Sequence, residues 1–156
     1  MPRPTPLPEK VRWLVLVAGL TASIPLYAVV VFVLASSAAA PVAPAPAGLR
    51  YVLYGAAFGV AFLSLVVAPR VGTDAATALP FDVFLRRTLI SLAIAETSAI
   101  LGLVLFFLGR NLADFLVLAG LALAVILLGI VPRGLRWFRL REDPAAGGGA
   151  PPLSPG

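Results

Sequence analysis

The chain has 156 residues, of which 60% are hydrophobic and only 12% charged, and its formal net charge is +5. A soluble domain of this length could not cover so much apolar surface, because soluble proteins average about 25% charged residues. The composition therefore indicates a protein of the lipid bilayer, whose basic residues lie at the membrane surface and not on nucleic acid.

Four apolar segments are long enough to cross about 30 Å of hydrocarbon as helices of roughly 20 residues. They cover residues 13–35, 51–68, 88–108 and 112–131. The sequence thus predicts an all-α, four-span transmembrane helical bundle over residues 13–131. We expect residues 1–12 to form a cytoplasmic tail, and residues 132–156 to form a second cytoplasmic tail that is basic and then rich in Pro and Gly.

The first span contains Pro25, which has no N–H to donate and therefore frees the carbonyl of Thr21 and predicts a kink. Small residues at positions 35–40 follow this span and resemble a signal-peptide cleavage site. The apolar run is longer than the roughly 7–15 residues of a signal core, which favours an uncleaved anchor. Cleavage would leave three spans in the same orientation.

The spacing of the basic residues predicts the topology. Ten of the twelve lie before the first span, between the second and third, or after the fourth; only Arg50 and Arg110 lie on the other side. The positive-inside rule then puts both termini in the cytoplasm. The abundance of Ala, Gly, Pro and Arg indicates a GC-rich bacterial genome, and hence the inner (plasma) membrane. The short turn at residues 109–111 predicts that the third and fourth spans are antiparallel neighbours.

Several residues at the ends of the spans favour a surface position. Trp13, Trp137 and Phe138 have the placement of interfacial anchors. Asp114 follows the outer turn beside Arg110, and we interpret it as an interfacial charge. The basic run at 133–141 is suited to anionic lipid headgroups.

Glu96 is the only charged residue within 88–108, and a carboxylate at bilayer depth costs at least a few kcal/mol, so it is the strongest candidate for a functional residue. Its helical face carries apolar neighbours, namely Leu89, Leu92, Ile100 and Leu103. Such surroundings favour the protonated carboxyl. Because no span contains Lys or Arg, we expect a hydrogen-bond partner at similar depth in the first span: Ser23, Tyr27 or the freed carbonyl of Thr21.

Small residues mark two further helix faces. One seam on the third span lies beside Glu96 and consists of Ser91, Ala95, Ser98 and Gly102. On the second span, Gly55 and Gly59 form a G-x-x-x-G pair. Both patterns predict close helix packing.

The segment 93–104 reads AIAETSAILGLV and resembles the carboxylate-bearing helix of the c subunit of rotary ATP synthases, the proteolipid. In that family the carboxyl that corresponds to Glu96 binds the translocated proton and faces outward from a ring. The resemblance implies proton binding at Glu96.

The residues leave three roles for Glu96 open: a protonated carboxyl that joins two helices, a proton-exchanging group, and a contact to a partner subunit. The sequence contains neither Cys nor His, no phosphate-binding glycine loop and no paired carboxylates within a span. We therefore expect no enzyme, no metal and no cofactor. The favoured interpretation is an accessory or structural subunit of a membrane assembly, as a homo-oligomer or with other membrane subunits; the alternative is a proton-binding, proteolipid-like element of a translocation pathway.

Overall fold

The protein is an all-α bundle of four long apolar helices. The computed structural model describes residues 8–37, 45–69 and 79–142, and these residues contain no strand. The helices that are long and apolar enough to cross a membrane are Glu9–Ser36, Ala47–Val67, Phe81–Gly109 and Leu112–Glu142. The predicted four-span bundle is therefore confirmed, with helices that extend beyond several of the expected span limits.

The first long helix is interrupted once, close to Pro25. It consists of α1 (Glu9–Thr21) and α2 (Ser23–Ser36), separated at Ala22. Hydroxyl groups bond to the backbone around this break, with the Oγ of Ser23 donating to the Leu20 carbonyl at 2.6 Å. The interruption lies where Pro25 cannot donate to the carbonyl four residues before it.

The second and third long helices are uninterrupted, and a two-residue turn follows the third. They are α3 (Ala47–Val67) and α5 (Phe81–Gly109). The turn uses Arg110 in the left-handed conformation, with φ 52°, and Asn111, whose side chain caps the next helix by accepting from the Ala113 N–H at 3.0 Å. This tight turn makes α5 and the fourth long helix antiparallel neighbours, as the sequence predicts.

The fourth long helix changes its winding midway. It begins as α6 (Leu112–Ala124), passes through one π-helical stretch, η1 (Val125–Ile130), and continues as α7 (Val131–Glu142). Residues 132–142, expected in the basic tail, are thus part of the helix. They are ordered by packing, because Gly134, Trp137 and Phe138 are buried on the face that α7 turns toward the bundle.

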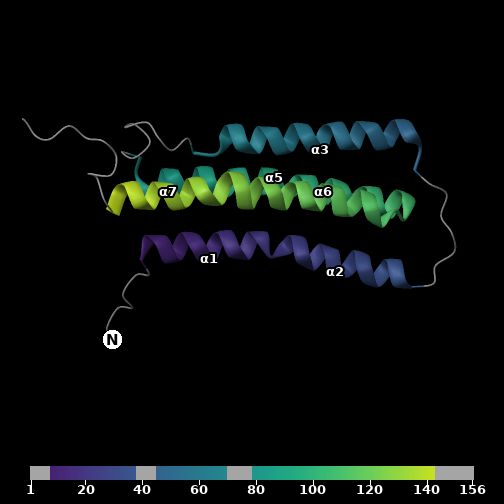
Figure 1. Ribbon diagram of the computed structural model, residues 1–156, viewed down its shortest axis with the longest axis horizontal. Coiled ribbons are helices and arrows are strands. Elements are labelled where there is room, and N and C mark those ends of the chain that lie inside the picture. Colours follow the sequence, from purple (N-terminus) through teal and green to yellow (C-terminus); the bar gives the residue numbers. More distant parts are fainter. Residues whose placement is uncertain (1–7, 38–44, 70–78, 143–156) are drawn as a thin grey trace, which may run out of the picture.

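The helices are arranged around a central hairpin. α5 packs against α6 and η1, and ring contacts join it to α7; α3 lies on one side of this pair and α1–α2 on the other (Figure 1). The two helices that come first in the chain are therefore separated by the two that come last. The start of α1 and the end of α7 lie at the same end of the bundle.

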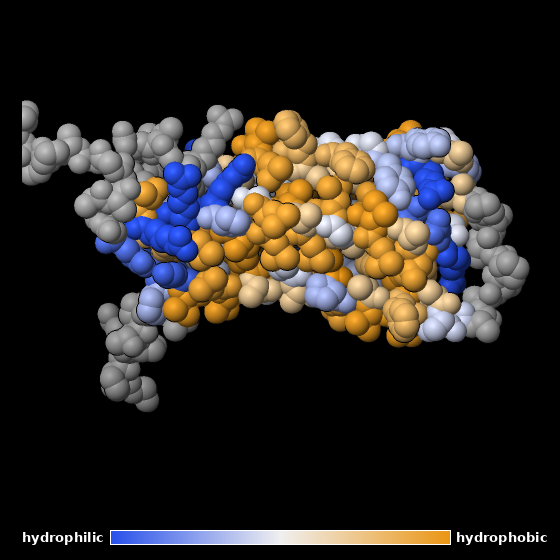
Figure 2. Space-filling view, in the orientation of Figure 1, coloured by the Kyte–Doolittle hydropathy of each residue, from blue (hydrophilic) through white to orange (hydrophobic). Residues whose placement is uncertain are grey.

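The surface has the distribution of polarity expected for a protein that crosses a bilayer. A broad hydrophobic band covers the middle of the molecule, and hydrophilic residues gather toward its two ends (Figure 2). Large apolar side chains such as Phe62 and Leu128 are more than two-thirds exposed in this band. Lipid would cover them, so the structure fits a multi-pass membrane protein.

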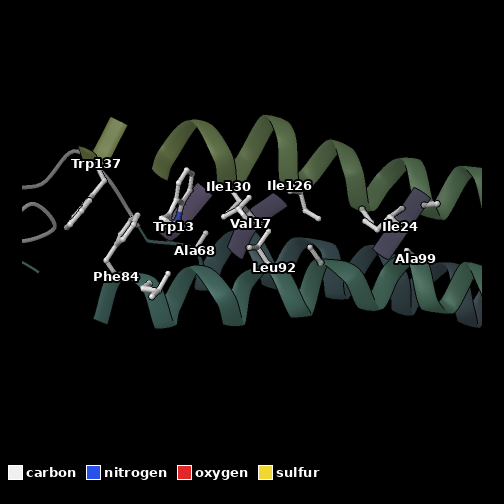
Figure 3. Packing of buried hydrophobic residues seen from close by; sticks show 14 of the residues in the cluster. Trp13, Val17, Ile24, Ala68, Phe84, Leu92, Ala99, Ile126, Ile130 and Trp137 are labelled. Atoms are coloured by element: carbon white, nitrogen blue, oxygen red, sulfur yellow. The ribbon is translucent and has the colours of Figure 1, made fainter. Parts of the chain in front are cut away.

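One end of the bundle holds a buried aromatic cluster, formed by Trp13, Phe81, Phe84, Trp137 and Phe138 (Figure 3). The rings of Phe84 and Trp137 stack with centroids 4.1 Å apart, and Phe138 meets the edge of the Trp13 ring at 5.6 Å. The expectation that Trp13, Trp137 and Phe138 anchor at the lipid interface is wrong. These rings are buried between α1, α5 and α7 because Gly134 leaves room for the Trp13 indole.

Candidate functional site

Glu96 lies at the interface of two spans and is joined to a tyrosine there. The hydroxyl of Tyr27 on α2 donates a hydrogen bond to Oε1 of Glu96 on α5, with 2.9 Å between the oxygens. Both side chains are half-buried. The intramembrane carboxyl thus has a polar partner from a helix distant in the sequence.

Apolar packing on both helices holds this pair in place. On α2, Ile24 and Val31 are buried one turn before and after Tyr27. On α5, Leu92 and Ala99 are buried one turn before and after Glu96. All four belong to the main hydrophobic cluster of the protein, so the hydrogen bond lies in a row of interhelical contacts.

The Ser23 hydroxyl, a second candidate partner, bonds within its own helix, and so does the hydroxyl of Thr21, whose carbonyl was the third candidate. The hydroxyl of Thr21 donates to the Val17 carbonyl at 2.8 Å, and that of Ser23 to the Leu20 carbonyl at 2.6 Å. Short hydroxyl side chains commonly bond the carbonyl three or four residues earlier in this way. Only the longer tyrosine side chain spans the distance between the two helices.

The apolar surroundings expected for Glu96 are partly inside the protein and partly on its surface. Leu92 is buried, Leu89 and Leu103 pack partly buried against the core, and Ile100 is exposed. The carboxyl therefore lies at the boundary between the α2 contact and the outer face of α5. This position leaves Glu96 accessible from one side.

The small-residue seam of α5 packs against two different helices. Toward α3, the hydroxyl of Ser91 donates to the Ser64 carbonyl at 2.6 Å and that of Ser98 to the Ala57 carbonyl at 2.9 Å. Ala95, between the two serines on this seam, is fully buried. Gly102 instead faces α6, where an added Cβ would lie 3.0 Å from the Cβ of Leu118.

The glycine pair on α3 has no such neighbour. Gly55 and Gly59 are exposed, and a Cβ added at either would have nothing within 4 Å. The same face carries exposed Val52, Phe62 and Val66, at alternating spacings of three and four along the helix. These five exposed residues are called the α3 outer row below.

A second polar cluster lies at the end of the bundle opposite the aromatic rings, and the sequence interpretation missed it. Asp114 is 3% exposed, and its Oδ1 accepts from Nε of Arg50 at 3.0 Å, from Nη2 of the same guanidinium, and from the Tyr54 hydroxyl at 2.9 Å. Asp114 is thus paired with Arg50 on α3. The sequence interpretation of Asp114 as an interfacial charge beside Arg110 did not predict this partner. The i, i+4 spacing of Arg50 and Tyr54 on one helical face was the available signal.

Arg110 instead binds backbone. Its guanidinium donates to the Leu34 carbonyl at the end of α2, at 3.2 Å. This contact closes the gap between the α5–α6 turn and the first span. Both arginines of this end therefore hold helices together.

The polar contacts of both clusters join pairs of helices. No group of three or more His, Cys, Asp or Glu side chains lies close enough together in residues 8–37, 45–69 and 79–142 to hold a metal ion. The Tyr27–Glu96 hydrogen bond joins α2 to α5, and the Arg50–Asp114–Tyr54 cluster joins α3 to α6. Comparisons with known protein families, curated proteins and solved structures found no match to this chain.

Proposed function

We propose that this protein is a small accessory or structural subunit of a membrane assembly, and that it contacts another transmembrane helix through the α3 outer row. The proposal rests on Gly55 and Gly59, which lie one turn apart on an exposed face with open space where a Cβ would be. Glycine within a helix costs up to about 1 kcal/mol relative to alanine. Neither glycine is required for packing inside the described chain, whereas a second helix could approach closely there.

The flanking residues suit the same contact. Val52, Phe62 and Val66 continue the row on both sides of the glycines and would pack around an approaching helix. The partner is a second copy of this chain or a different membrane subunit. The ten-to-two distribution of basic residues supports an orientation in the bacterial inner membrane with both termini cytoplasmic.

Photocrosslinking in native membranes tests this contact. A photoreactive phenylalanine analogue at Phe62 should give a crosslinked product, and the mass of the product distinguishes a second copy from another subunit. The same analogue at Leu128, which is equally apolar and 79% exposed on η1, should give none.

The glycines supply the matched variants. Gly55→Leu with Gly59→Leu should abolish the product from position 62. Gly19→Leu with Gly120→Leu should leave it intact, because these two glycines also have open space around them but lie on other helices. Absence of a product from position 62, or a product that survives the Gly55 and Gly59 changes, would overturn the proposal.

The second candidate function is proton binding at Glu96 in a translocation pathway, as in a proteolipid. It is supported by the half-buried position of Glu96, which is accessible from the outer side of α5 and bonded to an ionisable tyrosine. An apolar carbodiimide attacks protonated carboxyls in apolar surroundings. It should therefore label Glu96 slowly at pH 8 and faster at pH 5.

Mass spectrometry of the labelled chain would locate the adduct, with Glu96→Gln as the unreactive control. Tyr27→Phe should accelerate labelling, because the carboxyl then loses its hydrogen-bond donor. Absence of labelling over this pH range would leave two roles for Glu96: a carboxyl that joins two helices, or a carboxyl that a partner subunit shields.

A further inference from the structure

The end of the bundle that holds the aromatic cluster is strongly basic. Among the described residues it carries eight basic side chains and three acidic ones, so its net charge is +5. The opposite end carries Arg50, Arg110 and Asp114, a net charge of +1. The positive charge of the folded bundle is therefore concentrated at one end.

Three of the basic side chains at this end are engaged within the protein. Lys10 pairs with Glu142 at 3.3 Å, and Arg141 pairs with Glu9 at 3.2 Å, so two reciprocal ion pairs join α1 to α7. Arg133 donates to the Leu65 carbonyl near the end of α3 at 2.9 Å. These contacts use both glutamates of this end.

The remaining five arginines form what we call the basic collar. It consists of Arg12, Arg86, Arg87, Arg136 and Arg139, all of which are exposed. Within residues 8–37, 45–69 and 79–142, none of them makes a salt bridge. Among the described residues, the one other acidic side chain at this end is Asp82, which is exposed at the start of α5.

The collar lies at the same end of the bundle as the aromatic cluster. Arg12 is adjacent in sequence to Trp13, Arg136 to Trp137, and Arg139 to Phe138, and each of these aromatic rings is buried in the cluster. Three exposed arginines of the collar thus each follow or precede a ring that is buried inside the bundle. The hydrophobic band begins directly beyond this end (Figure 2).

We propose that the basic collar binds the phosphate groups of anionic phospholipids and gathers these lipids around α1, α5 and α7. Arginine recognises phosphate through paired N–H donors, and exposed cations beside a membrane attract anionic headgroups. The five arginines are exposed and make no salt bridge within the part of the chain that the structure describes, which gives charge complementarity to this one class of lipid. The inference does not depend on a partner at the α3 outer row.

The two tryptophans make this end directly observable. They are the only ones in the chain, and both lie in the aromatic cluster inside the collar. The full chain is reconstituted in phosphatidylcholine bilayers that contain increasing fractions of a lipid with a nitroxide quencher near the headgroup. Labelled phosphatidylglycerol should quench tryptophan fluorescence at a several-fold lower mole fraction than labelled phosphatidylcholine at low salt, and 1 M salt should reduce this preference.

Charge variants then test the collar itself. Arg136→Gln with Arg139→Gln should lower the preference for phosphatidylglycerol by about twofold or more, whereas the same positions changed to Lys should retain it. Asp82→Asn, which removes a negative charge near the collar, should raise the preference for phosphatidylglycerol. Equal quenching by the two lipids, an unchanged preference in the Gln pair, or an equal loss in the Lys and Gln pairs would overturn the proposal. Circular dichroism of each variant checks that the helices are intact.

Discussion

Arg50 on α3 and Asp114 on α6 form an ion pair in which the carboxylate is almost completely buried and the guanidinium is nearly half-exposed. Two nitrogens of the guanidinium donate to one carboxylate oxygen, and the Tyr54 hydroxyl donates to the same oxygen. The pair therefore fastens α3 to the central hairpin at the end that lacks the aromatic cluster. Its asymmetric burial means that the two partners respond differently to substitution.

Arg50→Gln should destabilise the protein by about 2 kcal/mol. The change leaves Asp114 buried without its cation, and removing one partner of a buried pair typically costs about 3–5 kcal/mol, which the partial exposure of Arg50 reduces. Unfolding in mixed micelles measures the free energy. The double variant Arg50→Gln with Asp114→Asn should recover part of the loss; a double variant as unstable as the sum of both single ones would show that the pair is not coupled.

Gly134→Ala should destabilise the protein by about 1–3 kcal/mol through overpacking. The added Cβ would lie 2.1 Å from Cζ2 of Trp13, whose ring is held by Phe84 and Phe138. Gly19→Ala is the matched control, because nothing lies within 4 Å of its Cβ position and helix propensity should stabilise it by up to about 1 kcal/mol. Thermal unfolding followed by tryptophan fluorescence distinguishes them. Equal stabilities for the two variants would contradict the packing described around Trp13.

Tyr27→Phe and Glu96→Leu should each break the hydrogen bond between α2 and α5, and a double-mutant cycle should give a coupling energy of about 0.6 kcal/mol, and at most about 2 kcal/mol. Glu96→Gln keeps the shape and can still accept the tyrosine hydrogen, so a purely structural role predicts nearly unchanged stability and function. Loss of function in Glu96→Gln at normal stability and membrane level would instead require proton release from Glu96.

Both ends of the chain should lie in the cytoplasm if the basic collar follows the positive-inside rule. A fluorescent protein fused after Gly156 should therefore be fluorescent, and alkaline phosphatase at the same site should be inactive, because it works only when exported. A fusion within residues 38–44 should give the opposite pair of results. An active phosphatase after Gly156 would reverse the orientation proposed for the bundle.

The sequence predicts the spans well because length and hydropathy are local properties. It predicts the α5–α6 turn because a connection of two residues allows few arrangements of the helices that it joins. It predicts side-chain partners less well, since these depend on which helices become neighbours. The requirement that a partner lie at the same depth in the first span reduced the candidate partners of Glu96 to three groups. In the structure the partner is Tyr27, because α2 packs on α5. Gly55 and Gly59 were expected to pack, yet no hydropathy signal says that α3 turns them outward.

The same difficulty explains why the sequence did not predict the buried aromatic cluster or the Arg50 partner of Asp114. Trp137 follows an apolar run, which is also where interfacial aromatics lie, and only the space left by Gly134 reveals a buried cluster. Asp114 has Arg110 close by in sequence, but Arg50 reaches it from a helix 64 positions away. In both cases the deciding neighbour comes from another span.

The central position of the last two spans also sets an order of assembly in the membrane. α1–α2 and α3 enter first, yet each packs chiefly against helices that are synthesised later. Until α5 emerges, Tyr27 has no carboxyl to bond, and until α6 follows, Arg50 has no counter-ion. The early spans must therefore remain in lipid as separate helices, and the C-terminal hairpin completes the fold by inserting between them.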